Sequence, residues 1–474
     1  MRKNWLAAAL LTGGLSLGGC DLDDDKYYKW LPSGELRVIH ASPDAPPVNV
    51  LINGQTRIEG LDYGDASPYA PLLVGNYHIA VEGIIPGGNS TVIEVGAFPI
   101  TKNAMPTVLA VNNVSAIEPL VITPSAAHPG ADEVALVVTH GAPVAGPVDV
   151  YVTAPGADIS GASPAFTFDF KDSIDVGALP VGTVELQVAV SDTLVYNSGP
   201  VDLSAFAGQR LMLVAINSEN ATEQAAAPIK LLAVTQDTSL ALLDADTLAG
   251  ARVVHASPDA GAAAGGPVEV FAASPALGAD PVEVIDGFAY TDIVPAADSY
   301  ISIPAGDYEF SVAPDTDSIG DAVFTSPALG LSAGTEYTVM AAGRVTSTPA
   351  FGLLASVDDN RPIATQVSLK VTHGAPAAGV VDVYVTAAGE FSAAEVVAGM
   401  AGAPVLADFA FGTTTDYLAL SAGDYDIRVV AGGAAAINLE GLSFTGGQVL
   451  HAIARGPAEP AGSPADFGVI LLSN

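Results

Sequence analysis

The sequence contains very few cysteines, basic residues and tryptophans. Cys20 is the only cysteine, so no intramolecular disulfide can form and the fold must be held together by apolar cores. Lys and Arg number 16 against 52 Asp and Glu, which gives a formal net charge of -36. A chain this acidic is repelled by phosphate backbones, so we expect no nucleic-acid partner. The two tryptophans, Trp5 and Trp30, leave no tryptophan for a sugar-binding platform further along the chain.

The length and the remaining composition indicate several β domains. A chain of 474 residues is too long for one ordinary core and suits three or four domains. A hydrophobic content of 50% excludes global disorder. Gly 49 and Pro 34 exceed average usage without a collagen-like period, which is typical of a turn-rich all-β protein.

The N-terminus has the pattern of a secretory signal peptide. Two basic residues open the chain, an apolar run spans 5–17, and Gly18 and Gly19 precede Cys20. The ending Leu-Gly-Gly-Cys resembles the bacterial lipobox, and this resemblance implies cleavage before Cys20 and lipidation of its thiol. The alternative is a short membrane helix, but the apolar run falls short of the ~20 residues that span a bilayer.

This interpretation assigns residues 1–19 to the signal peptide and residues 20–34 to a lipidated tether. The lipid on Cys20 would then attach the protein to a membrane of the cell envelope. We expect the outer membrane or the cell surface, because acidic runs after the cysteine resemble surface-export signals in some bacteria. Inner-membrane retention through Asp21 stays open, because an aspartate at that position is associated with retention in enteric bacteria.

One strand pattern recurs four times along the rest of the chain. A short apolar strand ends in His, a small pair and Pro, with the histidines at His40, His140, His255 and His373. An alternating strand follows, starting 8 residues after the histidine in three copies and 13 residues after it in the third. The extra residues of the third copy form a glycine-alanine insertion, Gly261 to Gly266. Repeats of this length indicate tandem modules.

Each copy has the length and strand count of an immunoglobulin-like β-sandwich of ~100 residues. Copies one and three share His-Ala-Ser-Pro-Asp, while copies two and four share His-Gly-Ala-Pro, so a two-module unit was itself duplicated. We therefore expect an all-β protein with four tandem sandwiches in a row. A propeller is the alternative, but its blades are less than half this long. The predicted repeats span 35–125, 133–235, 250–357 and 367–474.

The repeated motifs resemble those of the bacterial domain of unknown function family 4397. The resemblance rests on His-Ala-Ser-Pro-Asp-Ala-Pro, the alternating strand after it and a later Gly-x-Tyr turn, and it covers nearly all of residues 35–474. It implies an exported, often lipid-anchored protein of tandem β domains, and it implies no activity. Copies two and four replace Asp44 and Asp259 by Val144 and Ala377, so any role of the aspartate is absent there.

The four repeated histidines invite a metal-site hypothesis, which their spacing argues against. A structural zinc site needs about four converging ligands, and domains ~100 residues apart cannot readily supply one histidine each. We interpret the histidines as structural groups that end a strand and hydrogen-bond the loop after it. A local site of His255 with Asp259 is the remaining alternative.

Other candidate chemistry is sparse. Ser42 and Ser257 lie two residues from a histidine, but the other copies have alanine there, so we predict no catalytic residues and no enzyme. Asp315, Asp317 and Asp321 are calcium candidates in a loop that departs from the EF-hand pattern; solvated loop acids are the alternative. We expect no other metal or cofactor.

Two surface features follow from strand alternation. Tyr151 and Tyr384 are predicted on the outward face of their strands, where they would form a modest ligand platform or simply face solvent. Asp424, Asp426 and Arg428 are predicted to face water as well.

These observations predict a non-enzymatic, lipid-anchored envelope protein whose domains form a surface stalk or adhesion module. The alternative is a periplasmic or surface protein that binds a glycan or another small ligand, with loops such as the insertion of the third copy. A hydrolase is a third hypothesis, and it requires convergent titratable side chains in one domain.

Overall fold

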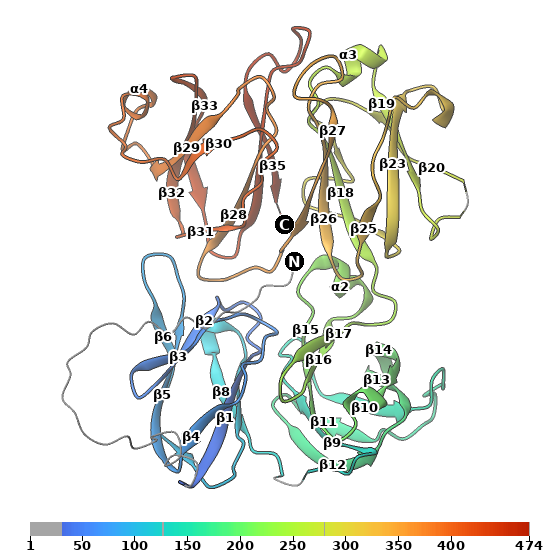
Figure 1. Ribbon diagram of the computed structural model, residues 1–474, viewed down its shortest axis with the longest axis vertical. Helices are drawn as coiled ribbons and strands as arrows, with labels where there is room; N and C mark the ends of the chain where they lie inside the picture. Colours follow the sequence, from blue (N-terminus) through green and yellow to red (C-terminus); the bar gives the residue numbers. More distant parts are fainter. Residues whose placement is uncertain (1–30, 126–127, 279, 474) are drawn as a thin grey trace, which may run out of the picture.

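The computed structural model describes residues 31–125, 128–278 and 280–473. The predicted signal peptide, Cys20 and Asp21 lie outside these residues. Within them the chain is all-β, and the predicted tandem β-sandwich modules are confirmed (Figure 1). No described helix is both long and apolar enough to cross a lipid bilayer.

The first module sets the pattern for the others. Its inner sheet has the order β4-β1-β7-β8 and its outer sheet the order β3-β2-β5-β6. The histidine strand β1 pairs in parallel with the late strand β7, with Arg37 opposite Thr107. Leu36, Val48 and Ile79 belong to the core between the two sheets. The strands are β1 Ser33–His40, β2 Val48–Ile52, β3 Gln55–Leu61, β4 Ala70–Leu73, β5 Gly75–Gly83, β6 Ser90–Ile100, β7 Thr107–Val111 and β8 Glu118–Ile122, with a 3-10 turn η1 at Val114–Ala116.

The second module repeats this arrangement and adds one strand to its inner sheet, β12-β9-β15-β16-β17. Its outer sheet has the order β11-β10-β13-β14. Its elements are β9 Glu133–His140, β10 Val148–Thr153, β11 Phe166–Phe168, β12 Ser173–Pro180, β13 Thr183–Val190, β14 Thr193–Asp202, η2 Leu203–Phe206, β15 Arg210–Asn217, α2 Ala221–Ala226, β16 Ile229–Val234 and β17 Ser239–Leu242.

The third module has a more broken strand pattern. Its inner sheet follows β21-β18-β26-β27, with β22 also on β18. Its elements are β18 Ala249–His255, α3 Ala260–Ala264, β19 Val268–Ala273, β20 Val282–Phe288, β21 Ile293–Val294, β22 Ile301–Ile303, β23 Gly306–Pro314, η3 Ile319–Asp321, β24 Phe324–Thr325, β25 Leu329–Leu331, β26 Glu336–Ala342 and β27 Gly352–Asp358.

The fourth module returns to two four-stranded sheets, β31-β28-β34-β35 and β30-β29-β32-β33. Its elements are β28 Val367–His373, β29 Val381–Ala387, α4 Ala393–Val397, β30 Leu406–Phe409, β31 Leu418–Leu420, β32 Gly423–Ala431, β33 Ala434–Phe444, β34 Val449–Arg455 and β35 Gly468–Ser473.

The Gly-x-Tyr turn has the same role in three modules. The hydroxyls of Tyr77, Tyr308 and Tyr425 donate to the carbonyl four residues earlier, at 2.9, 2.7 and 2.9 Å. This contact resembles the tyrosine corner of immunoglobulin-like sandwiches, where a hydroxyl fixes the chain as it enters a strand.

The inner sheets are buried on both faces because modules pack in pairs. One apolar cluster joins Ile39 and Leu109 of the first module to Met212, Val214 and Leu232 of the second. A second cluster joins the third and fourth modules in the same way. Every residue of β7, β16 and β26 is consequently buried. We call these two contacts the first and the second interface.

The four sandwiches follow one another along the chain as predicted, but they do not form a row in space. Figure 1 shows the modules two by two, with the fourth module above the first and the third above the second. Arg361, which precedes the fourth module, donates to the carbonyl of Ala45 in the first at 2.8 Å. Thr222 in α2 donates its backbone N–H to the Glu336 carboxylate of the third module at 2.9 Å. The apolar faces of the inner sheets account for the pairing of modules, because an unpaired face would remain in water. The hydrogen bonds of Arg361 and Thr222 then connect the two pairs into a block.

Loops that cross the outer sheets bury two groups of residues predicted to face water. Tyr151 is 6% exposed, because the loop 154–165 is held over this face by the Glu185 carboxylate and the Gln187 amide. Asp426 and Arg428 are also buried, with their charges 3.2 Å apart. The Asp426 carboxylate accepts the backbone N–H of Gly389, in the loop after β29, and that of Gly441 in β33, both at 2.8 Å.

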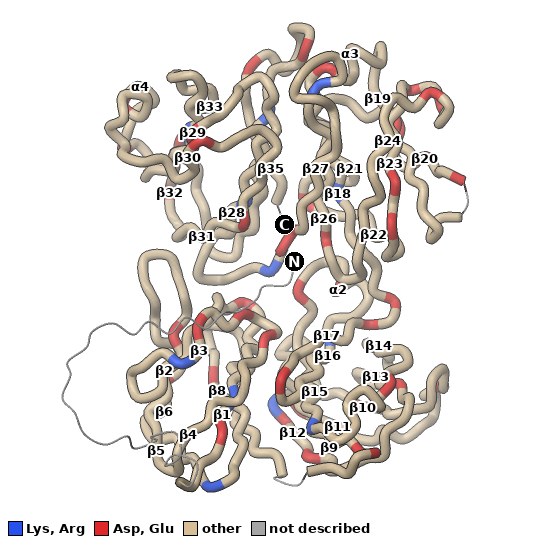
Figure 2. The backbone as a smooth tube through the Cα atoms, viewed as in Figure 1, with Lys and Arg blue, Asp and Glu red and all other residues tan. Residues whose placement is uncertain are grey.

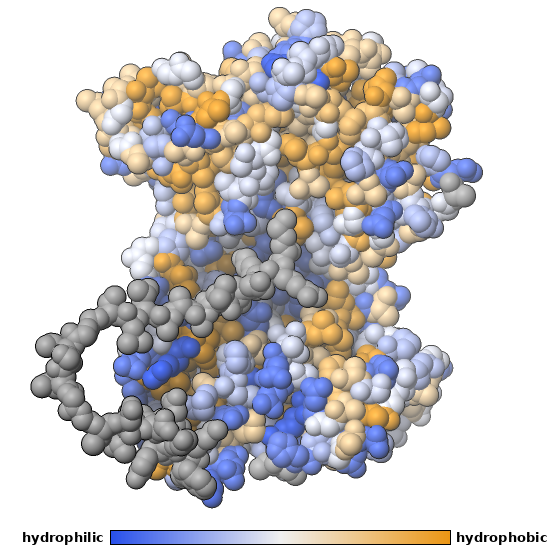
Figure 3. All heavy atoms as spheres, in the orientation of Figure 1, coloured by the Kyte–Doolittle hydropathy of each residue, from blue (hydrophilic) through white to orange (hydrophobic). Residues whose placement is uncertain are grey.

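The surface carries the excess negative charge. Figure 2 shows acidic residues distributed over all four modules, with few basic residues among them. Figure 3 shows hydrophobic and hydrophilic side chains mixed over the same face.

Candidate functional site

The repeated histidines make local hydrogen bonds at the end of the inner strand. The Nδ1 atom of each accepts the backbone N–H two residues later, at 3.3 or 3.4 Å. Nε2 therefore carries the proton, and in His40, His140 and His373 it donates to the carbonyl six residues later, at 2.8 to 3.0 Å. Burial lowers the pKa of His40 and of His255 to about 4, so both are neutral near pH 7.

The third module differs because of its insertion. Residues 261–266 contribute to α3, and among the described residues no carbonyl takes the Nε2 proton of His255. The carboxylate of Asp259 does not face His255; it accepts the backbone N–H groups of Val345 and Thr346 at 2.8 and 3.1 Å. Asp44 makes the corresponding contact to Val114 at 2.6 Å. The repeated aspartate thus fixes the loop after the late strand.

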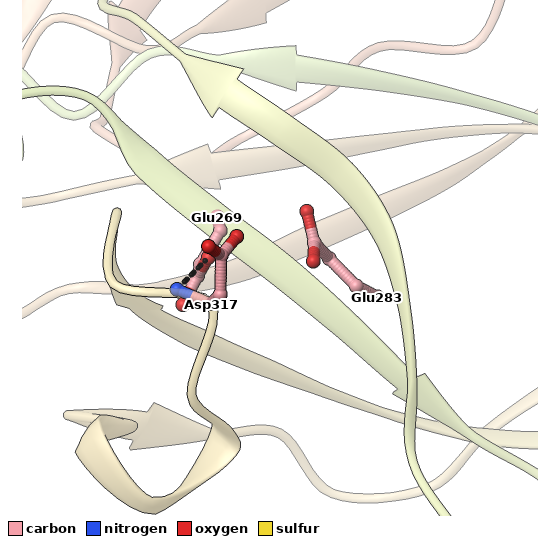
Figure 4. Close-up of side chains that lie close together, drawn as sticks. All are labelled: Glu269, Glu283 and Asp317. Atoms are coloured by element: carbon pink, nitrogen blue, oxygen red, sulfur yellow. Dashed lines mark hydrogen bonds between the residues drawn. The ribbon is translucent and has the colours of Figure 1, made fainter.

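The three calcium candidates do not come together. Asp317 lies near Glu269 and Glu283, with their oxygens within 4.8 Å of one another (Figure 4). Asp315 and Asp321 are not members of this group; the Asp321 carboxylate accepts the Thr316 hydroxyl instead at 2.9 Å. Glu269 is fully buried and its oxygens accept the backbone N–H groups of Asp317 and Ser318 at 3.0 and 3.1 Å. Partial desolvation and the neighbouring acids raise the pKa of Glu283.

Two sizeable cavities occur in the described residues. One, of about 300 Å³, lies beside α3 and is lined mainly by apolar side chains such as Val312, Val323 and Phe351. The insertion predicted to be a ligand loop contributes Ala263 and Ala264 to its wall.

The other cavity lies at the first interface, has a volume of about 310 Å³ and is hereafter called the interface cavity. Its wall includes β1, the turn before β4, β9, β12, the start of β15 and the turn after β16. The side chains that matter below are Arg37, Tyr69, Pro124, Val137, Asp175, Arg210, Met212 and Asp237.

Arg37 is the unusual residue of the interface cavity. It is 3% exposed, and its guanidinium lies 4.4 Å from the ring centre of Tyr69. One nitrogen donates to the carbonyl of Thr235 at 2.5 Å, while Nε has no hydrogen-bond partner in the described residues. No described carboxylate pairs with it, including Asp175 and Asp237. Burial lowers the pKa of Arg37 without neutralising it at pH 7.

The equivalent arginine of the third module has a carboxylate partner. Arg252 also lies three residues before the histidine, and its guanidinium is 4.5 Å from the ring centre of Tyr300. Asp358, whose side chain is fully buried, lies 3.4 Å from Arg252 and 2.9 Å from Lys370 of the fourth module. Burial alone would raise the pKa of Asp358, but the charge of Lys370 and the Thr338 hydroxyl hold it below its ordinary value.

Strand register explains the cavity at the first interface. Arg37 and Arg252 lie opposite Thr107 and Thr338 in the parallel pairs. We extended these strand pairings to the neighbouring strands to find equivalent positions in the two interfaces. Four bulky or charged residues of the second interface have smaller or apolar counterparts that line the interface cavity. The counterparts of Asp358, Lys370, His451 and Tyr417 are Pro124, Val137, Met212 and Asp175.

The basic residue before the histidine was missed from the sequence, although a signal was present. Arg37, Arg252 and Lys370 all lie three residues before it, inside otherwise apolar strands of a chain with only 16 basic residues. A cation at a repeated buried position indicates a specific partner, because burying an unpaired charge is costly.

Comparison with known proteins identifies a family for this chain. A family model described as a domain of unknown function, DUF4397, matches residues 34–151 and 249–384, together more than half of the chain. No curated protein matches the chain. A solved structure titled "The Bacillus anthracis TIE protein" aligns at 10% identity and a TM-score of 0.15, covering 86% of this chain. The aligned part spans 65% of that structure's chain, and so low a TM-score does not establish a shared domain arrangement.

Proposed function

The chain belongs to the DUF4397 family, whose function is unknown, and we propose that it is a non-enzymatic binding protein of the bacterial cell envelope. In this proposal a small ligand enters the interface cavity between the first two modules. The observation that carries the proposal is a cavity of about 310 Å³ that contains the buried, incompletely bonded guanidinium of Arg37. Ligand pockets typically measure about 300–1,000 Å³ and combine apolar walls with a few polar groups.

The geometry around the repeated histidines supports a role without catalysis. Ser42 and Ser257 are fully buried, and their backbone N–H groups donate to the histidine beside them. The hydroxyl of Ser257 donates to the carbonyl of Gly343 at 2.8 Å. A nucleophile needs its hydroxyl directed at a base and accessible to substrate, and neither condition is met here.

The block of modules supports the binding alternative over the stalk. A stalk requires modules placed end to end, whereas the contacts of Arg361 and Thr222 hold the two pairs together. The lipid on Cys20 would attach this block to the membrane through residues 20–34. Protease shaving of intact cells, with a periplasmic protein as leakage control, tests whether the block faces outward.

Thermal unfolding of the mature chain, residues 20–474, tests the binding function. Glucuronate, glucose and inorganic phosphate are added separately at millimolar concentration. At least one should raise the unfolding midpoint, because a ligand that binds only the folded state stabilises it.

Ala178→Trp on β12 is designed to obstruct the cavity that this residue lines, and Ala434→Trp, at an exposed position of β33, is the matched control. The stabilisation by ligand should vanish in A178W and persist in A434W. Equal stabilisation in both variants, or none in the wild type, would contradict binding in the interface cavity.

A further inference from the structure

The two interfaces start from the same cation and the same aromatic ring. Arg37 with Tyr69 and Arg252 with Tyr300 occupy equivalent positions, at 4.4 and 4.5 Å from cation to ring centre. A tyrosine on the face of a guanidinium leaves the edge of the guanidinium as its hydrogen-bonding side. The two modules thus present equivalent donors to the contact with their partner module.

Among the described residues, only the second interface pairs its arginine with a carboxylate. The Asp358 carboxylate accepts from Arg252, Lys370 and the hydroxyl of Tyr300. Its counterpart in the first interface is Pro124, which has no acceptor in its side chain and lines the interface cavity. Arg37 therefore retains a buried positive charge beside an open volume, which is unfavourable unless a further group pairs with it.

We propose that the interface cavity binds a small molecule through a carboxylate group, which pairs with Arg37 as Asp358 pairs with Arg252. The inference deepens the proposed function and rests on it, because it names the chemical class that the cavity takes. A planar carboxylate matches the fork of a guanidinium and can accept two parallel hydrogen bonds.

The other residues of the wall restrict the charge and the size of the ligand. The wall carries two carboxylates, Asp175 and Asp237, as well as a second cation, Arg210. Beside these two carboxylates a ligand with one negative charge fits better than a phosphate with nearly two. Val137 and Met212 contribute apolar side chains to the wall. A volume of about 310 Å³ accommodates an acid of roughly monosaccharide size.

Calorimetric titration of the mature chain tests the carboxylate preference. D-Glucuronate is compared with D-glucose, which has a neutral hydroxymethyl group in place of the carboxylate, and with inorganic phosphate. Glucuronate should bind roughly tenfold or more tightly than glucose, the effect of a hydrogen bond to a charged group. Phosphate should bind more weakly than glucuronate.

Three variants locate the contact. Arg37→Met should remove the preference for glucuronate over glucose, because it removes the guanidinium. Pro124→Asp should also weaken glucuronate binding, because it supplies an internal carboxylate. Pro124→Asn is the matched neutral control and should retain the preference.

Each pattern of results decides between the two proposals. Cavity-dependent binding of glucose without preference for glucuronate would overturn the carboxylate inference and leave the binding function standing. Tighter binding of phosphate than of glucuronate, or a preference that survives in R37M, would also overturn the inference. Failure of all three probes to bind the wild type would overturn both.

Discussion

The two interfaces of this protein share a buried arginine stacked on a tyrosine. They differ in whether the protein itself supplies a carboxylate that pairs with the arginine. In the second, Asp358 lies between Arg252 and Lys370, and the contact is filled by charged and aromatic side chains. In the first, Arg37 occupies the position of Arg252, but Pro124 occupies the position of Asp358. The difference teaches that two modules of one chain can keep the same buried cation while only one of the interfaces supplies a carboxylate to pair with it.

Removal of the Asp358 carboxylate should have the largest effect. Asp358→Ala leaves Arg252 and Lys370 buried without their shared counter-charge, so the free energy of unfolding should fall by about 3–5 kcal/mol. Urea unfolding measures the change, with Asp286→Ala on the exposed part of β20 as control. A loss no greater than that of the control would show that the buried charges do not depend on this carboxylate.

Removal of the arginine should affect the two interfaces differently. Arg252→Met removes one of the two cations that pair with Asp358, so the free energy of unfolding should fall by about 1–3 kcal/mol. Arg37→Met exchanges a buried, unpaired cation for an apolar side chain and should change it by less than about 1 kcal/mol. The same urea experiment compares both variants, and equal losses would contradict the assigned difference.

The small residue after the histidine should tolerate enlargement poorly in the second and fourth modules. A Cβ added to Gly141 would lie 3.1 Å from the carbonyl oxygen of Ala215 and 3.2 Å from a methyl of Val214. Gly141→Ala should therefore lower the free energy of unfolding by about 1–3 kcal/mol. Gly146→Ala is the control, because nothing lies within 4 Å of its added Cβ. Equal stability of the two variants would remove this explanation for the alternation of alanine and glycine between copies.

The pH dependence of stability should be steeper with His451 than without it. Burial, above all other causes, lowers the pKa of His451 from 6.5 to about 3 in the folded state. As the pH falls, His451 is therefore protonated in the unfolded chain before it is protonated in the folded protein. The contribution of neutral His451 to the free energy of unfolding is complete above pH 6.5 and is lost as the pH falls toward the folded pKa.

His451→Met introduces the residue found at the equivalent position of the first interface. It should reduce the slope of unfolding free energy against pH by about 1.4 kcal/mol per unit between roughly pH 4 and 6. Urea titrations at several pH values measure that slope. An unchanged slope would mean that His451 is protonated in the folded state.

The repeat architecture could be predicted because its signals are local. Each module shows its histidine and its alternating strands within about 100 residues, the length of an immunoglobulin-like sandwich, and three of the four add the Gly-x-Tyr turn. The sequence also contains a sign of the pairing of modules, which an analysis of in-and-out alternation does not detect. The strand β7 reads Thr-Val-Leu-Ala-Val with every residue buried, a continuous run that indicates burial on both faces of a sheet.

The cavity could not be predicted because it depends on residues far apart in the sequence. Val137 and Lys370 occupy equivalent positions, and only the structure shows what each meets across its interface. Tyr151 and Asp426 were misplaced for a related reason, since loops cover strand faces that alternation assigns to solvent. Sequence periodicity specifies the two faces of a strand and leaves open what covers each face.

The double-mutant cycle between positions 37 and 124 tests the central claim most directly, because it needs no ligand. Pro124→Asp and Pro124→Asn are each combined with Arg37 and with Arg37→Met, and the free energy of unfolding is measured for all four proteins. The account predicts that P124D is more stable than P124N when Arg37 is present, and that this advantage disappears with R37M. If the difference in unfolding free energy between P124D and P124N is the same with Arg37 and with R37M, the carboxylate at position 124 does not pair with Arg37. That result would contradict the account.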